Sequence, residues 1–304
     1  MAITNTRVSS SRIVVPTATA PGSARALYKG RNSNGETTWL MRFPNTAVGI
    51  PLGLAGQSIM WNTMSTAPFS RKIDVYPNWF FWVAALSALV IVLVIYVIKA
   101  VYHKEVVRFE WKDNVRSYFF YGPVLACLML GIGAPHSIRS APVLRALWAV
   151  AATVQLALTS TIYRRWLFSP VGHLGNARAV HQMSTVGWFF LCNLGQSVDL
   201  EGAWGINFPA MSFGAGAFFY SIIVTAIFQN LHEHPADKFH PSLFLLLAPP
   251  SVASLSIAGF QGSFATASQA VFGSVIVLLV MLLRLFRTML EPPSTYARRL
   301  RSCM

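Results

Sequence analysis

Eight apolar segments run through this chain, and they constrain its fold more than any other feature of the sequence. They lie at about 43–63, 79–100, 117–134, 143–162, 182–198, 204–230, 241–263 and 265–286. A stretch of about 20 apolar residues is long enough to cross the hydrocarbon core of a bilayer as a helix. Charged residues make up only 11% of the chain, whereas soluble domains contain about 25%. The pattern predicts an all-α membrane protein with about 8 transmembrane helices.

These segments divide the chain into three parts. Residues 1–40 form a basic N-terminal tail, residues 41–286 form the transmembrane domain, and residues 287–304 form a basic C-terminal tail. The N-terminal tail is polar and has no acidic residue before Glu36, so we expect it to be disordered. Its composition also suits an organellar transit peptide. The plasma membrane is therefore the expected location, and an organellar membrane is the alternative.

The basic residues predict the orientation in the membrane. Of the 24 lysines and arginines, only Arg71, Lys72, Arg139 and Arg145 fall on the side opposite the two tails. Lysine and arginine accumulate in cytoplasmic loops, so both termini are expected to face the cytoplasm. The net charge is +14, and anionic membrane lipids are a sufficient binding partner for the basic residues. Nucleic acid is not expected as a partner, because the basic residues lie in loops between apolar segments and form no stripe with exposed aromatic residues.

Prolines distinguish alternate segments. The first, third and seventh segments contain Pro51, Pro123 and the pair Pro249 and Pro250, whereas the second, fourth and eighth have no interior proline. Proline frees backbone carbonyls, which a membrane tolerates where protein or a water-filled cavity meets them. Odd segments would then line an interior and even segments would face lipid, as helical hairpin repeats around a central pore. Ordinary kinks in a packed bundle would give the same prolines, and the pattern alone leaves both interpretations open.

The segments also restrict the chemistry. No Asp, Glu, Lys, Arg or His lies deep inside any of them. Intramembrane ionisable groups mark proton relays and ion-coupled pumps, so this absence favours a passive pore. No phosphate-binding glycine loop, spaced cysteine pair or catalytic triad can be recognised. We therefore expect no enzymatic activity, no cofactor and no metal.

Hydroxyl groups and helix ends could stabilise an anion in such a pore. N–H groups at helix N-termini attract negative charge, and hydroxyl groups could add donors. Small hydroxyl residues also allow helices to approach closely, and this packing role is the alternative for each of them. The hydroxyl candidates are Ser58, Ser184, Thr185, Ser251, Ser254 and Ser256.

Aromatic residues and serines supply two further candidate sites. Tyr118-Phe119-Phe120-Tyr121 precedes Pro123, and a ring that projects into a pore would act as a gate. An aromatic belt at the membrane interface is the alternative. Ser9, Ser10 and Ser11 lie between Arg7 and Arg12, a setting that suits a kinase acting on the N-terminal tail. Ordinary composition of a disordered tail is the other interpretation.

Four motifs resemble the slow-type anion channel and tellurite-resistance/dicarboxylate transporter family. The first segment reads Arg42-Phe43-Pro44, then Gly49-Ile50-Pro51-Leu52-Gly53. The third reads Arg116-Ser117-Tyr118-Phe119-Phe120-Tyr121-Gly122-Pro123, and the fifth has His181 before Ser184-Thr185-Val186-Gly187. The seventh, which is the most specific, reads Ala248-Pro249-Pro250-Ser251-Val252-Ala253-Ser254. The resemblance covers roughly residues 40 to 286.

The resemblance implies a ten-helix fold of five hairpins around a pore that is lined by the odd helices. It implies passive conduction of small anions such as chloride, nitrate or malate, and gating by phenylalanines. The family's aromatic residue of the third helix corresponds best to Phe120. The other pore or gate positions that follow from the motifs are Phe119, Pro123, Phe43, Pro51, Pro249, Pro250 and Ser251. The family also implies a homotrimer and regulation by phosphorylation of the tail.

This chain departs from the family in its number of spans. We expect four hairpins and about 8 helices here, against ten in the family, with the ninth and tenth absent after Phe286. A ring that lacks one hairpin would expose its pore wall to lipid, where freed backbone groups find no partner. Two alternatives to a channel therefore stay open. One is a secondary transporter of C4-dicarboxylate or tellurite-like anions with the same fold, and the other is a truncated subunit that does not conduct.

Overall fold

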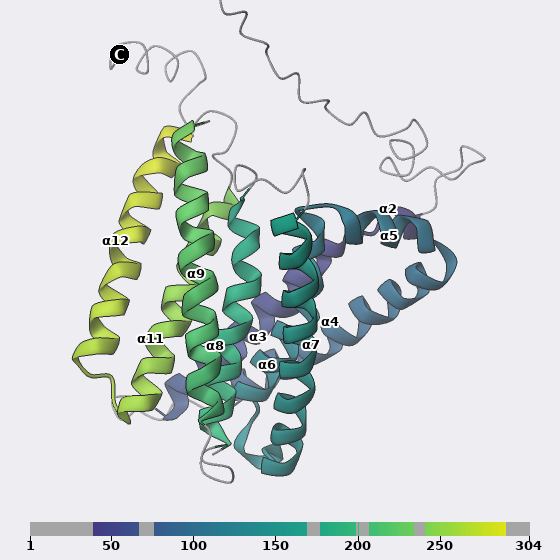
Figure 1. The fold of residues 1–304 in the computed structure, drawn as a ribbon. Helices are drawn as coiled ribbons and strands as arrows, with labels where there is room; N and C mark the ends of the chain where they lie inside the picture. Colours follow the sequence, from purple (N-terminus) through teal and green to yellow (C-terminus); the bar gives the residue numbers. More distant parts are fainter. Residues whose placement is uncertain are drawn as a thin grey trace, which may run out of the picture. The chain divides into compact units, whose positions relative to one another are not determined.

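The computed structural model describes residues 39–66, 76–168, 177–198, 200, 207–233 and 241–289. Within these ranges all regular secondary structure is helical, so the expected all-α fold is confirmed. The chain separates into two units, Met1–Phe43 and Pro44–Met304. In the first unit the described element is the short helix α2 (Trp39–Arg42). The second unit contains all the other helices (Figure 1).

Four long α-helices form the exposed layer of the second unit. They are α4 (Tyr76–Tyr102), α7 (Ala141–Phe168), α9 (Phe208–Glu233) and α12 (Thr266–Met289). Each corresponds to an even apolar segment and runs without interruption. Large apolar side chains on these helices are exposed, such as Ile91 at 58% and Val277 at 60%. An apolar surface of this extent is typical of helices that face a bilayer.

The odd segments form a second, more buried layer, and each begins with a 3₁₀ turn that passes directly into an α-helix. The pairs are η1 (Asn45–Val48) with α3 (Gly49–Thr66), and η2 (Arg116–Tyr121) with α6 (Gly122–Ile132). Next come η5 (Ala179–Gln182) with α8 (Met183–Ser197), and η6 (Pro241–Leu247) with α11 (Ala248–Gln261). Helix α8 is almost completely buried.

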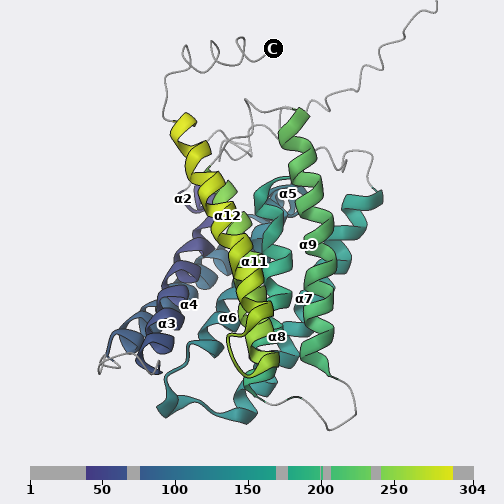
Figure 2. The same cartoon turned by 90° about the vertical axis from the view of Figure 1, so that its left-hand side faces the viewer.

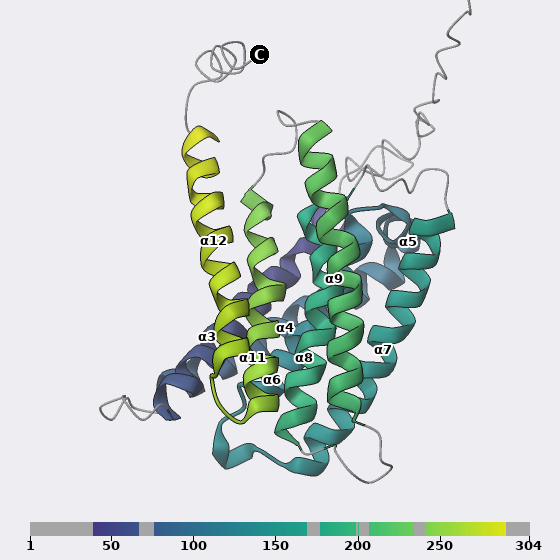
Figure 3. The same cartoon turned by 60° about the vertical axis from the view of Figure 1, so that its left-hand side comes forward.

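Each inner helix pairs with the outer helix that follows it and with the next inner helix. Extensive packing joins α3 to α4, α6 to α7, α8 to α9 and α11 to α12, and also α3 to α6, α6 to α8 and α8 to α11. Figures 2 and 3 show α3 with α4, and α11 with α12, as neighbouring helices, in agreement with this packing. Among the described residues, no comparable packing joins α11 back to α3. The inner helices therefore form an arc that is not closed within these residues.

Tryptophan and glutamine side chains connect the two layers. Trp82 of α4 donates to the carbonyl of Leu130 in α6 at 2.9 Å, and Trp148 of α7 donates to the carbonyl of Leu191 in α8 at 2.8 Å. Gln155 of α7 donates to the carbonyl of Ser184 at 2.7 Å. These bonds give donors to backbone carbonyls of the inner layer. A carbonyl without a donor in an apolar environment would destabilise the fold.

The structure corrects the expected number of spans. By length and composition, five helical segments could cross a membrane: 76–102, 141–166, 208–229, 242–261 and 266–284. A sixth is added if α5 (Lys104–Lys112) and the η2–α6 segment count as one span, although the two are bent by 105°. Helix α8 has only 15 residues, and α3 contains polar residues such as Gln57 and Asn62, so neither meets this criterion. The expectation of about eight spans was therefore too high by this criterion.

Candidate functional site

The junctions between 3₁₀ turns and α-helices are the positions that the proline pattern singled out. Pro51 is the third residue of α3, Pro123 the second of α6, and Pro249 and Pro250 follow the first residue of α11. Proline lacks an N–H group, and the first turn of a helix needs none. The carbonyl of Phe119 illustrates the result: it accepts from Gly122 N–H, because Pro123 has no N–H to offer.

This placement corrects one part of the sequence interpretation. The prolines were expected to kink the odd helices in their interior, but they begin these helices instead. As a result, an α-helix begins directly after the 3₁₀ turn in each of these three inner segments. Helix N-termini carry a partial positive charge and unpaired N–H groups. Each of these α-helices continues from a 3₁₀ turn, and the N–H groups of Gly49 and Gly122 donate to carbonyls of that turn, so the dipole of the helix is the part of the hypothesis that the structure keeps.

The candidate aromatic residues have different surroundings. Phe119 packs against the main buried cluster, which contains Tyr118, Tyr121 and residues of α8. The ring of Phe120 lies edge-on to Tyr96 of α4 at 5.8 Å and to Trp111 of α5 at 4.9 Å. Two consecutive rings therefore contact opposite layers of the protein. Phe43 is partly buried and belongs to the first unit, so its position relative to the inner helices is not described.

All six candidate hydroxyls make hydrogen bonds within the protein. Ser251 donates to the carbonyl of Leu247 at 2.6 Å, and Ser254 to the carbonyl of Ser268 at 2.8 Å. The other donors are Ser58 to Gly133, Ser184 to His181, Thr185 to Gln182, and Ser256 to Val252. A hydroxyl has a single proton to donate. Ser58 and Ser254 thus bond to carbonyls of other segments, and the other four bond to carbonyls three or four residues earlier in their own segment.

A buried polar cluster surrounds the start of α8. His181 is fully buried, and its ring lies 4.1 Å from that of Tyr118, measured between centroids. Its Nδ1 accepts the backbone N–H of Arg178 at 3.1 Å. Burial lowers the pKa of His181 to about 4, so the ring is neutral at physiological pH. Tyr118 Oη, His181 Nε2 and Trp166 Nε1 have no hydrogen-bond partner among the described residues.

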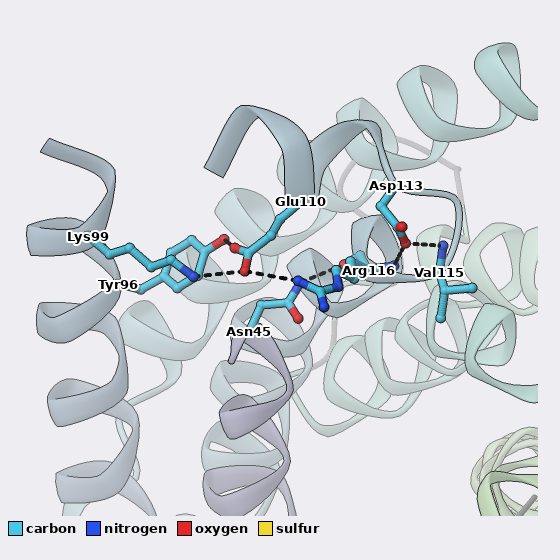
Figure 4. Close-up of polar contacts among 7 residues, drawn as sticks. All are labelled: Asn45, Tyr96, Lys99, Glu110, Asp113, Val115 and Arg116. Carbon is cyan, nitrogen blue, oxygen red and sulfur yellow. Dashed lines mark hydrogen bonds and ion pairs between the residues drawn. The ribbon is translucent and has the colours of Figure 1, made fainter. Parts of the chain in front are cut away.

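Sequence reasoning missed an ionic cluster at the end of α4. Figure 4 shows Glu110 of α5 between Lys99 and Arg116, with its Oε1 2.8 Å from Lys99 Nζ and 3.6 Å from Arg116 Nη1. Its other oxygen accepts the hydroxyl of Tyr96 at 2.7 Å. The side chains of Lys99 and Glu110 are only 0% and 2% exposed. The cluster fastens α5 to α4 in a region that the sequence interpretation treated as a loop.

The same cluster reaches the first inner segment. Asn45 donates from its side chain to the carbonyl of Arg116 at 2.8 Å, and Asp113 accepts the backbone N–H groups of Val115 and Arg116. Aspartate in this position fixes the start of a helical turn. The polar contacts of Figure 4 therefore join η1, α4, α5 and η2 at one end of the unit. An amphipathic pattern in 104–112 is the sequence signal that could have revealed α5.

The expected phosphorylation sites and the expected lack of a metal site involve residues that the structure describes only in part or not at all. Ser9, Ser10 and Ser11 lie outside the described residues. Among the residues that are described, no group of histidine, cysteine, aspartate or glutamate side chains could hold a metal ion.

Comparisons with known proteins agree with the resemblance seen in the sequence motifs. The model of a family described as voltage-dependent anion channel matches residues 42–294. The chain is 31% identical to the S-type anion channel SLAH2 of Arabidopsis thaliana, over 83% of this chain and 49% of the relative. It is 30% identical to SLAH3 of the same plant, over 79% and 38%, and 27% identical to the guard cell S-type anion channel SLAC1, over 81% and 45%.

The matches differ in extent from the predicted membrane domain and from the full length of the relatives. The family match runs past residue 286, where the sequence interpretation ended the membrane domain, as far as residue 294. The chain also spans about half the length, or less, of these three relatives.

Proposed function

Since the chain belongs to the voltage-dependent anion channel family, we propose that its inner helices form a passive pathway for small anions such as chloride, nitrate or malate. The observation that carries this proposal is the character of the inner layer. Helices α3, α6, α8 and α11 contain no Asp, Glu, Lys, Arg or His. They are enclosed on one side by the continuous apolar helices of the outer layer.

Electrostatics supports anions over cations on this pathway. Helices α3, α6 and α11 each have a proline in the first turn, so each of these inner segments contains the N-terminus of an α-helix. Helix N-termini favour negative charge by about 0.3–1 kcal/mol each. Weak sites of this kind suit conduction, because an ion must leave as readily as it enters. A fixed charge in the pathway would bind the anion more tightly and slow its release.

The gate that we propose is the aromatic pair Phe119 and Phe120 before α6. Their rings pack on opposite sides of η2, one on the inner core and the other on α4 and α5. Consecutive residues of a 3₁₀ turn are about 120° apart, so a rotation of η2 by about one residue would exchange which ring faces the inner layer. We expect Phe119→Ala or Phe120→Ala to raise the anion current at a given voltage. Tyr220→Phe, in the outer helix α9, is a matched aromatic control and should leave the current unchanged.

The direct test is anion current from this chain expressed alone in oocytes. Surface biotinylation would show that the protein reaches the plasma membrane, and water-injected cells supply the background. A reversal potential that follows the chloride or nitrate gradient supports the channel. A reversal potential that shifts with pH would instead indicate coupled transport. A chain that reaches the surface and carries no current would contradict the proposal for this chain alone.

Assembly is part of the same proposal, because the described inner helices form an open arc. We propose a homotrimer in the plasma membrane with cytoplasmic termini, in line with the family resemblance and the distribution of basic residues. Native mass spectrometry of the purified chain would measure the number of subunits. Cysteine labelling at Asp113 and at Arg139 from either side of the membrane would test the orientation. Equal labelling of both positions from outside would contradict it.

A further inference from the structure

We propose that a pocket beneath α5 binds the headgroup and upper acyl chain of an anionic phospholipid. The pocket has a volume of about 400 Å³. It is lined by Ala100 of α4, by Lys104, Val107, Arg108 and Trp111 of α5, and by Phe120 of η2. Apolar side chains form most of the lining, and the two polar members are both cations. This combination matches a molecule that has a negative head and a hydrocarbon tail.

Helix α5 has one face that lines the pocket and one that is buried. Lys104, Val107, Arg108 and Trp111 follow a spacing of three and four residues, so they share the face that lines the pocket. Val106 and Glu110 are buried against the protein. Lys112 is exposed and does not line the pocket. The cations of the pocket face are therefore free of the ion pair that Glu110 makes with Lys99.

The position of α5 places this pocket at a membrane surface. Helix α5 is bent by 105° from the segment that contains α6, so it lies across the direction of the bundle, at the end of α4 (Figure 1). The face of α4 next to Ala100 is apolar and exposed, with Val97 and Val101 each 60% exposed. An acyl chain that enters the pocket would continue along this face. Cationic residues at the end of a span attract anionic headgroups by about 1 kcal/mol each.

Two more arginines extend the positive charge next to the pocket. The guanidinium of Arg165 at the end of α7 lies 5.0 Å from the ring centre of Trp111. Arg165 and Arg164 also line a second hollow of about 360 Å³ with Ser160 and Thr161. A phosphate group prefers such a set of arginine and hydroxyl donors. The pocket itself thus takes its apolar residues from α4, α5 and η2 and its cations from α5, and Arg165 of α7 adds positive charge next to Trp111.

The test is lipid binding to the purified full chain, measured by native mass spectrometry. The chain would be titrated with phosphatidic acid and with phosphatidylcholine that have the same acyl chains. We expect phosphatidic acid to bind more tightly. Lys104→Gln and Arg108→Gln should each weaken its binding about fivefold, and the double variant about thirty-fold. Lys112→Gln removes the same charge from a residue of α5 that does not line the pocket, and it should weaken binding less than either of these variants.

Several results would overturn the proposal. The first is that phosphatidic acid and phosphatidylcholine bind with equal affinity. The second is that Lys112→Gln weakens binding as much as Lys104→Gln or Arg108→Gln. The third is that inorganic phosphate at equal concentration displaces all of the bound lipid. An acidic peptide that binds as tightly as the lipid would assign the pocket to a protein partner instead. The altered residues are exposed, so the variants should keep the thermal stability of the parent chain. Lipid binding is measured without current, and therefore its failure is distinct from a failure of the proposed conduction.

Discussion

The Lys99–Glu110 ion pair offers the sharpest test of how α5 is held on the unit. Both side chains are almost fully buried, and their charged atoms are 2.8 Å apart. Removing one member of a buried pair costs about 3–5 kcal/mol, because the remaining charge stays in an apolar environment. Glu110→Gln should lie at the lower end, about 3 kcal/mol, since glutamine retains an oxygen that can accept a hydrogen bond.

The two partners should not respond equally. In Lys99→Met, Glu110 keeps the hydroxyl of Tyr96 at 2.7 Å and Arg116 at 3.6 Å, so the expected loss is smaller, about 2 kcal/mol. The double variant removes both charges and should lose about 3 kcal/mol, well below the sum of the two single losses. The difference is a coupling energy of about 2 kcal/mol between the two residues.

Unfolding of the purified chain in mixed micelles, with denaturing detergent as the variable, would measure these free energies. Glu105→Gln is the matched control, because it removes a carboxylate from the exposed part of the same helix. It should change the stability by no more than about 0.5 kcal/mol. Losses that simply add in the double variant, or a Glu105→Gln loss as large as that of Glu110→Gln, would refute the reasoning.

Two further predictions concern the start of α8. A Cβ atom at Gly187 would collide with the side chain of Gln155, so Gly187→Ala should cost about 2 kcal/mol in the same unfolding assay. At Gly53 a Cβ meets nothing within 4 Å, and Gly53→Ala should not destabilise the chain. His181 has its pKa lowered to about 4 by burial, so the unfolded chain binds more protons than the folded chain between that pH and about 6.5. The free energy of unfolding should therefore fall by about 3 kcal/mol as the pH drops from 6.5 to 4. A His181→Gln variant with the same pH dependence would show that His181 is not the group responsible.

The apolar segments made the helical membrane fold predictable. A helical element occurs at each of the eight expected places, and the proline pattern separated the buried layer from the exposed one. Helix α8 is buried like the other odd segments, although it contains no proline. Glycine at position 187 lets the side chain of Gln155 approach the backbone of α8. Motif resemblance identified the family, and the family match confirms it.

The remaining features depend on contacts between distant residues. Lys99 and Glu110 are both ordinary charges in the sequence, and the turn at His103 between α4 and α5 brings one against the other. Ser254 looked like an anion ligand, yet its proton goes to the carbonyl of Ser268 in α12, which depends on the packing of α11 on α12. The span count was overestimated because α3 and α8, although helical, are too polar or too short to count as spans by length and composition.

The proposed lipid pocket and the proposed gate share one residue, and this links them. Phe120 lines the pocket and contacts Trp111, while Phe119 beside it packs on the inner core. A lipid in the pocket gains contacts only while Phe120 occupies this position, so binding must shift the balance between the two arrangements of η2. We expect the current of reconstituted protein to change at least about fivefold when phosphatidic acid replaces phosphatidylcholine. The Lys104→Gln/Arg108→Gln double variant should lose this response while Lys112→Gln keeps it. A response that survives in the double variant would show that the lipid acts elsewhere on the chain.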